Sequence, residues 1–99
     1  MTTNLLNTLE QAKTLRESYD VEYLTARENA RNIYKAVRTL EEKYEENQSE
    51  ETEEKLDEIY DIFEKACEAE TDAYDKYDKI NRAILKLQDA LDLINELEL

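Results

Sequence analysis

Apolar side chains recur along both halves of the chain at steps that alternate between three and four residues. The first series has one polar member, Arg16, and its apolar members are Leu5, Leu9, Ala12, Tyr19, Tyr23, Ala26, Ala30, Ile33, Val37, Leu40 and Tyr44. The second series has one polar member, Glu70, and its apolar members are Leu56, Ile59, Phe63, Ala66, Ala73, Tyr77, Ile80, Ile84, Leu87, Leu91 and Ile94. Such a seven-residue repeat with apolar a and d positions is typical of a left-handed coiled coil.

The two repeats do not share a phase. Continued past Tyr44, the first repeat puts its next a position at residue 51, whereas the second repeat begins at Leu56. A slip of five residues is neither of the insertions, of three or four residues, that a continuous coiled coil absorbs. A reversal of the chain explains the slip, because two antiparallel helices need not share a phase.

A single pairing rule tests this reversal. When positions whose numbers add up to 96 are placed side by side, every a residue of one helix lies level with a d residue of the other. Arg16, for example, is paired with Ile80, and Glu70 with Ala26. The rule places the centre of the bend at Gln48.

The segment around Gln48 carries signals for the end of one helix and the start of another. We expect Asn47 to take the left-handed conformation that often ends a helix. Ser49 is a good N-cap, and the acidic residues after it suit the positive end of a helix dipole. The sequence therefore predicts an all-α fold, a long antiparallel two-helix coiled-coil hairpin with helices over about residues 3–46 and 50–97. The chain is expected to form a single domain with its bend at 47–49.

Apolar residues also occupy the e and g positions on either side of these seams. A hairpin of two helices needs apolar side chains only at a and d, so the wider apolar stripe predicts a further helical contact. The simplest such contact is a homodimer that forms a four-helix bundle, with docking favoured at the leucine-rich end where both termini lie. The residues expected to dimerise are Leu6, Leu15, Ile62, Leu85, Leu93 and Leu97.

The composition argues against an enzyme. The chain has no His and no Gly, which excludes His-based acid–base chemistry, glycine-rich phosphate loops and EF-hand calcium loops. Glu70 is the only carboxylate on the seam, and its facing residue is Ala26. We therefore expect no catalytic residues, no cofactor and no metal site.

The chain carries 26 acidic and 13 basic residues, a net charge of −13. The segment 41–58, EEKYEENQSEETEEKLDE, holds ten acidic residues and two lysines. It is interpreted either as a solvated tip that keeps the hairpin soluble or as an anionic prong that enters a basic groove on another protein. Glu70 either sets the register or belongs to a binding surface among small alanines. The residues expected to bind a partner are Glu50, Glu51, Glu53, Glu54, Asp57, Glu58, Asp61 and Glu70.

Four cations of the first helix, Arg27, Arg31, Lys35 and Arg38, are expected to balance neighbouring acids. Direct binding of nucleic acid needs a basic face, so we do not expect it here. No apolar run approaches the roughly 18 residues of a membrane span, and no leader opens the chain. With a single cysteine, these features predict a cytoplasmic protein, in the host cytoplasm if it is viral.

Two functional hypotheses follow from these features. The first is a non-catalytic acidic helical protein that acts by protein–protein interaction, as an assembly, adaptor or structural coiled-coil module. The alternative is an acidic nucleic-acid mimic, such as a phage-encoded inhibitor, that blocks the basic site of a nucleic-acid-binding host protein.

Overall fold

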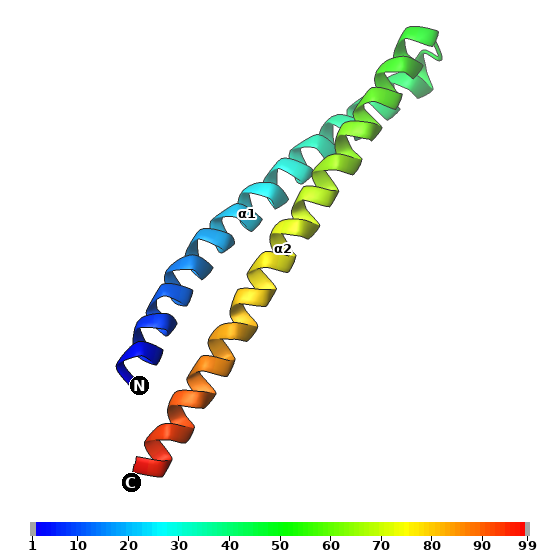
Figure 1. Cartoon of the computed structure of the whole chain (residues 1–99). Helices are drawn as coiled ribbons and strands as arrows, with labels where there is room; N and C mark the ends of the chain where they lie inside the picture. Colours follow the sequence, from blue (N-terminus) through cyan, green and yellow to red (C-terminus); the bar gives the residue numbers. More distant parts are fainter. Residues whose placement is uncertain (1, 99) are drawn as a thin grey trace.

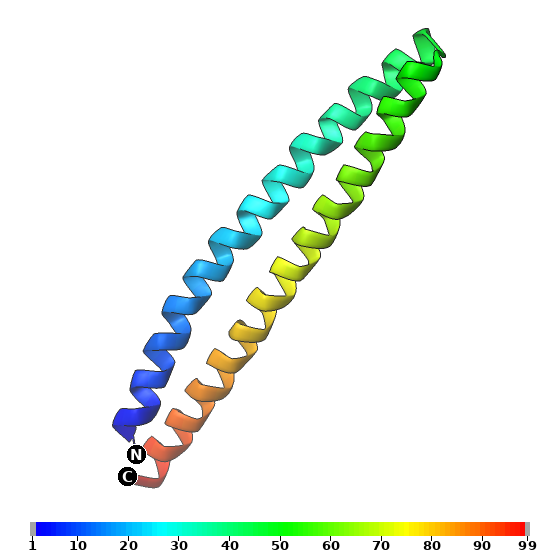
Figure 2. The same cartoon turned by 45° about the horizontal axis from the view of Figure 1, so that its top comes forward.

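The protein consists of two long antiparallel helices. The computed structural model describes residues 2–98, in which α1 spans Thr2–Glu46 and α2 spans Glu50–Glu98. The helices lie side by side in a rod of 75 × 16 × 14 Å, with both termini at the end opposite the bend (Figures 1 and 2). The predicted all-α hairpin is confirmed, and each observed helix end lies within one residue of its predicted position.

The core is the seam that the seven-residue repeats predict. Every a and d position from Leu5 to Ile94 is buried or half-buried. Ile84, with 1% of its surface exposed, is the most completely enclosed. Most other seam residues are only half-buried, because a pair of helices cannot cover all sides of a seam residue. The buried apolar residues are Leu9, Ala30, Val37, Leu56, Ala66, Ala73, Ile84 and Leu91.

Contacts between the helices follow the pairing rule. Near the termini, Leu9 packs in one cluster with Ile84 and Leu91, and the half-buried Leu87 lies against it. Nearer the bend, the ring centroids of Tyr34 and Phe63 are 5.7 Å apart. The position numbers of contacting residues add up to values close to 96 at both ends of the rod, so one register holds along its length.

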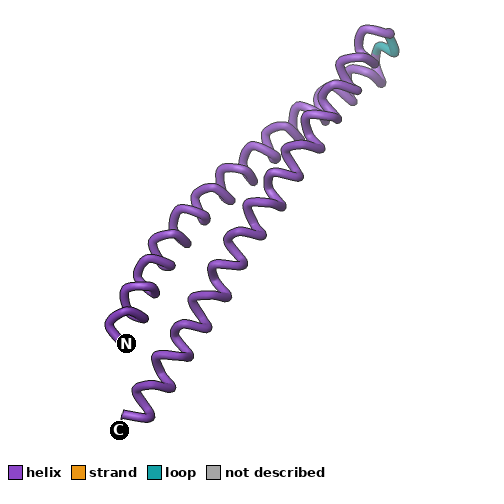
Figure 3. Tube along the Cα trace, viewed as in Figure 1, coloured by secondary structure: helices purple, strands orange, loops and turns teal. Residues whose placement is uncertain are grey.

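The bend differs from the prediction in its backbone geometry. The N–H of Asn47 still donates a helical hydrogen bond to the carbonyl of Lys43, 2.9 Å away, and the N–H of Ser49 donates to the carbonyl of Asn47 at 2.8 Å. No residue between 2 and 98 has a positive φ, so this three-residue turn is an inverse γ-turn centred on Gln48. The expected left-handed conformation of Asn47 is therefore wrong, because Asn47 continues the helical bonding and the reversal falls on Gln48. Figure 3 shows how short the connecting loop is.

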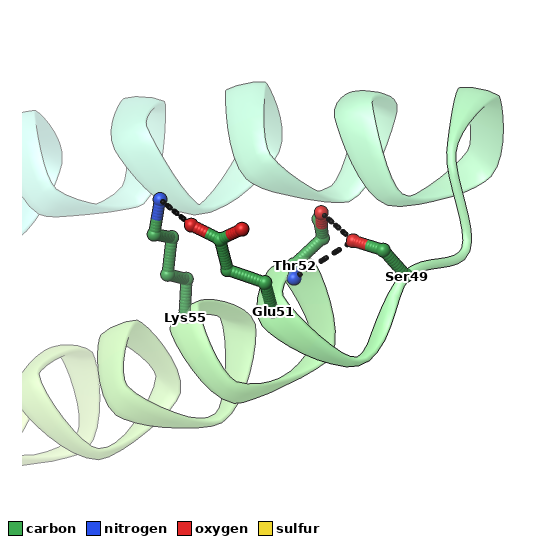
Figure 4. A network of polar contacts seen from close by, with 4 residues as sticks. All are labelled: Ser49, Glu51, Thr52 and Lys55. Atoms are coloured by element: carbon green, nitrogen blue, oxygen red, sulfur yellow. Dashed lines mark hydrogen bonds and ion pairs between the residues drawn. The ribbon is translucent and has the colours of Figure 1, made fainter.

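The start of α2 is capped as predicted. The Oγ atom of Ser49 accepts a hydrogen bond from the N–H of Thr52 at 3.2 Å, and the two hydroxyl groups lie 2.8 Å apart (Figure 4). The first helical bond of α2 runs from the N–H of Glu53 to the carbonyl of Ser49. Glu51 forms an ion pair with Lys55, one turn further along the same helix. Ser49 therefore satisfies a free donor of the first turn, which is the role of an N-cap.

Candidate interaction surfaces

Large apolar side chains remain exposed on both flanks of the seam. One flank, here called the tyrosine flank, carries the exposed residues Leu6, Leu24, Tyr34, Tyr60, Tyr74 and Leu85. The other, here called the alanine flank, carries exposed Leu15, Ile62, Leu93 and Leu97 together with the exposed alanines Ala36, Ala69 and Ala83. Except for Leu24, these residues were singled out from the sequence, and they divide between two separate surfaces.

The tyrosines of the tyrosine flank lean across the seam and contact the opposite helix. Tyr74 meets Tyr23 edge to face, with ring centroids 5.5 Å apart and an interplanar angle of 63°. The hydroxyl of Tyr60 donates a hydrogen bond of 2.9 Å to the carboxylate of Glu41. This hydrogen bond raises the pKa of Tyr60, with smaller contributions from desolvation and from the negative charges of Glu41 and Asp57. The flank is thus a set of oriented aromatic rings, each still partly exposed to solvent.

An apolar hollow of about 420 Å³ opens on the tyrosine flank. It is lined by Ala30, Arg31, Tyr34, Lys35, Phe63, Cys67 and Glu70. Ala30 is the only alanine in this lining; the other lining residues are aromatic, charged or cysteine side chains at the edge of the seam. Glu70 is half-buried at this place. The arrangement supports the interpretation of Glu70 as part of a binding surface.

The alanine flank has a smaller hollow between its two helices. A hollow of about 240 Å³ lies here, lined in part by Leu15, Tyr19 and Ile80. Beside it Lys76 on α2 lies 3.9 Å from the carboxylate of Glu22 on α1, which ties the two helices together across this flank. The small alanines along α2 give a smooth surface that another helix can approach closely.

Four cations form a basic stripe on α1: Arg27, Arg31, Lys35 and Arg38, all exposed. Within residues 2–98 none of them lies within 4.0 Å of a carboxylate, whereas five other cations do. The expectation that these cations are balanced by adjacent acids does not hold for direct ion pairs. The charges of the basic stripe are thus exposed to solvent without a direct ion pair among the described residues.

The acidic residues predicted to bind a partner are exposed at the bend and along the first turns of α2, except for Glu70. Glu51 and Asp61 pair with lysines of their own helix. The segment 41–58 has a net charge of −8 over a rod length of about 14 Å. That is roughly one net charge per 1.8 Å, close to the 1.7 Å of duplex DNA. The acids predicted to bind a partner that are exposed and form no ion pair are Glu50, Glu53, Glu54, Asp57 and Glu58.

The residues predicted to dimerise do not form one surface. Leu6 and Leu85 lie on the tyrosine flank near the termini. The other four, Leu15, Ile62, Leu93 and Leu97, lie on the alanine flank, so no single planar contact covers all six.

The sequence analysis also missed two exposed apolar residues, Val21 and Leu24, which are 64% and 51% exposed. They lie outside the a, d, e and g positions that were scanned for apolar residues. The detectable signal was two apolar residues three positions apart on the otherwise charged outer face of α1.

Nothing in the described chain points to metal chemistry or to a known relative. Residues 2–98 contain no group of three or more metal-binding side chains close enough to share an ion. Neither described helix combines the length and apolar character needed to cross a bilayer. No family model, curated protein or solved structure matches the chain.

Proposed function

We propose that this protein is a non-catalytic interaction module that packs its helices against a protein partner, in an assembly, adaptor or structural role. The observation that carries the proposal is the exposure of large apolar side chains along both flanks of the seam. Tyrosine and leucine side chains held in place by a rigid helix lose little conformational entropy on binding, which suits them to interfaces.

The exposed area supports the same proposal. The hairpin exposes 7642 Å², against about 5,900 Å² for a compact monomer of its mass. The difference, roughly 1,700 Å², is about twice the roughly 800 Å² that one partner buries in an ordinary protein–protein interface. A rod of two helices leaves this surface open to water until another helix covers it.

The alanine flank offers a direct test with an affinity-tagged full-length protein. Partners captured from the source cell are purified and their binding is measured with the isolated components. Replacing Leu15 and Ile62 with Asp is expected to weaken binding at least about a hundredfold, because two carboxylates would be desolvated in the contact. The matched control is Thr14→Asp, which adds a carboxylate on the outer face of α1.

Retention of full affinity by the Leu15 and Ile62 double variant would contradict a contact on this flank. The proposed function as a whole fails if no purified protein binds the wild-type hairpin.

A second candidate function is mimicry of nucleic acid by the acidic bend. The observation that favours it is the charge density of segment 41–58, which matches that of duplex DNA over a short length. The bend would then occupy the basic site of a nucleic-acid-binding protein. Such a complex weakens steeply as salt rises, since salt screens exposed charges.

Charge reversal separates the two candidate functions. Replacing Glu50, Glu51, Glu53 and Glu54 with Lys should abolish binding by a mimic and change little in a contact through the alanine flank. The control with the same change in net charge replaces four exposed acids near the C-terminus, Asp89, Asp92, Glu96 and Glu98. A complex that persists at high salt, or that responds equally to both sets of reversals, would exclude mimicry.

A further inference from the structure

We propose that the tyrosine flank binds a second copy of this chain in the antiparallel direction, with a two-fold axis beside Leu24. In this dimer the bend of each copy lies over the open end of the other, and α1 packs on α1 while α2 packs on α2. The inference goes beyond the proposed function, because it concerns self-association on one flank and leaves the alanine flank free.

The first observation is a charge pattern on α1 that is antisymmetric about Leu24. Between residues 10 and 38, every seventh residue on the outer side of the tyrosine flank belongs to one row: Glu10, Glu17, Leu24, Arg31 and Arg38. The row continues to Thr3 at one end and Glu45 at the other, which would face each other across the axis without a charge pair. Two acids therefore precede Leu24, and two arginines follow it at the same distances. When two copies of α1 lie antiparallel with Leu24 against Leu24, Glu17 of each copy faces the partner's Arg31, and Glu10 faces the partner's Arg38.

These charges do not find partners within one copy. Among residues 2–98, Glu17, Arg31 and Arg38 form no ion pair, and Glu10 reaches only Lys13 at 3.7 Å. Glu17 and Arg31 are 14 residues apart on one straight helix, about 21 Å along its axis, so they cannot meet in a monomer. A second copy brings both opposite charges together, and it does so twice because of the two-fold symmetry.

The second observation comes from α2 and places the axis at the same level. The pairing rule puts residue 72 of α2 level with Leu24, so an antiparallel pair of α2 helices shares the axis of the α1 pair. With residue 72 on the axis, Tyr60 lies within one residue of the level of the partner's Leu85, Glu64 of the partner's Asn81, and Thr71 of the partner's Tyr74. Aromatic and apolar side chains thus meet each other, and none of these pairs joins two charges of the same sign.

The same arrangement supplies an occupant for the hollow around Phe63. With residue 72 on the axis, the partner's Tyr74 comes level with Glu70, at one end of the hollow of about 420 Å³. An aromatic ring fits an apolar hollow of this size, and its hydroxyl can donate a hydrogen bond to the half-buried carboxylate. The dimer therefore explains why a seam carboxylate is kept beside small residues.

A two-fold axis along the rod is less favourable. It would place both bends at the same end, and each segment 41–58 has a net charge of −8. The antiparallel dimer separates these two segments by the length of the rod, 75 Å, which far exceeds the screening length of about 8 Å at physiological salt. One face of the rod, 75 by 16 Å, offers about 1,200 Å² in projection, more than the roughly 800 Å² per partner of a stable interface.

Charge exchange between Glu17 and Arg31 tests the proposal on the purified full-length chain. Sedimentation equilibrium is expected to show a dimer for the wild type. Glu17→Arg and Arg31→Glu should each weaken dimerisation at least about tenfold, because each places two pairs of like charges across the axis. The double variant should recover the wild-type dissociation constant to within about threefold. A monomeric wild type, or a double variant as weak as the single variants, would overturn the proposal.

A disulfide cross-link tests the position of the axis. In a Cys67→Ser background, Leu24→Cys is expected to form a covalent dimer under mild oxidation, because the two copies of residue 24 face each other. The matched control is Ile62→Cys in the same background, on the alanine flank, which should remain uncross-linked. Equal cross-linking at both positions, or none at residue 24, would contradict the axis at Leu24. Both assays use the protein alone, so their failure leaves the proposal of a different protein partner intact.

Discussion

The guanidinium of Arg16 on α1 donates a hydrogen bond of 3.3 Å to the side-chain oxygen of Asn81 on α2. Arg16 is the only polar residue in the seam of α1, and it lies level with Ile80. Its long side chain follows the seam and places its charged end at the edge, where Asn81 can accept the bond. The pair links two residues that are 65 positions apart and joins the helices in the observed register.

Replacing Arg16 with Leu is expected to stabilise the hairpin. Leucine would fill an a position between half-buried neighbours, and burying its side chain partially is worth about 1 kcal/mol. The midpoint of thermal unfolding, followed by circular dichroism at a fixed protein concentration, should rise. As a control, Asn81→Ala should lower it slightly through loss of the hydrogen bond alone. A lower midpoint for Arg16→Leu would mean that the polar pair contributes more than an apolar layer.

Truncation of Ile84 should be far more costly than truncation of an equally large residue outside the seam. Ile84 is the most completely enclosed side chain, so Ile84→Ala is expected to cost about 2–5 kcal/mol in the free energy of unfolding. Leu93, on the same helix, is 57% exposed, and Leu93→Ala should cost less than about 0.5 kcal/mol. Urea denaturation measures both values. Similar losses for the two variants would show that the seam is not the main stabilising contact.

Removal of the Ser49 hydroxyl should weaken the start of α2. Ser49→Ala leaves the N–H of Thr52 without its acceptor and is expected to lower the free energy of unfolding by about 1 kcal/mol. Ser49→Asp keeps an acceptor oxygen and should retain most of the stability despite the added negative charge. Urea denaturation of the three proteins gives the comparison. If alanine and aspartate behave alike, the cap does not depend on the hydrogen bond.

Tyr60 should ionise at a higher pH than an ordinary tyrosine, whose pKa is about 10. The hydrogen bond to Glu41 raises the pKa of Tyr60, because it favours the protonated phenol in the folded state. Its contribution to stability is therefore complete below about pH 10 and is lost as the pH rises through the pKa of the folded protein.

The phenolate absorbance of Tyr60 can be isolated by comparison with a Tyr60→Phe variant. Glu41→Gln should lower the pKa of Tyr60 towards the ordinary value, because a neutral amide accepts a weaker hydrogen bond from the phenol and no longer repels the phenolate. Glu42→Gln, a change on the outer face of α1, should leave that pKa unchanged. An equal shift in both variants would indicate a general effect of net charge.

The sequence was sufficient to predict the helices, the seam and the register. These features depend on the spacing of apolar residues along the chain, which is a local property of each helix. The pairing of positions then relates the repeat of one helix to the repeat of the other. The N-cap at Ser49 could be predicted for the same reason, since its hydrogen bond joins residues three positions apart. Such features need no knowledge of side-chain conformation.

The remaining features required the three-dimensional structure. The conformation of the bend depends on whether Asn47 keeps its bond to Lys43, and the residue type alone does not decide this. The hollow beside Phe63 depends on how the side chains of both helices, among them Tyr34 and Lys35, are placed around it. The division of the predicted dimerisation residues into two flanks follows from their heptad positions, e and b on one flank and g and c on the other, but the sequence does not show which flank a partner covers.

The single row of core layers has a consequence for the length of this protein. Each layer contacts mainly the layers above and below it, much as a repeat unit does in a solenoid. Removing seven residues from α1 and the seven facing residues from α2 would therefore shorten the rod by about 10 Å and leave every other layer paired as before. Removing seven residues from one helix alone would shift the layers beyond the cut by a whole heptad. The distance between the bend and the termini can thus change without loss of register only in paired steps of seven residues.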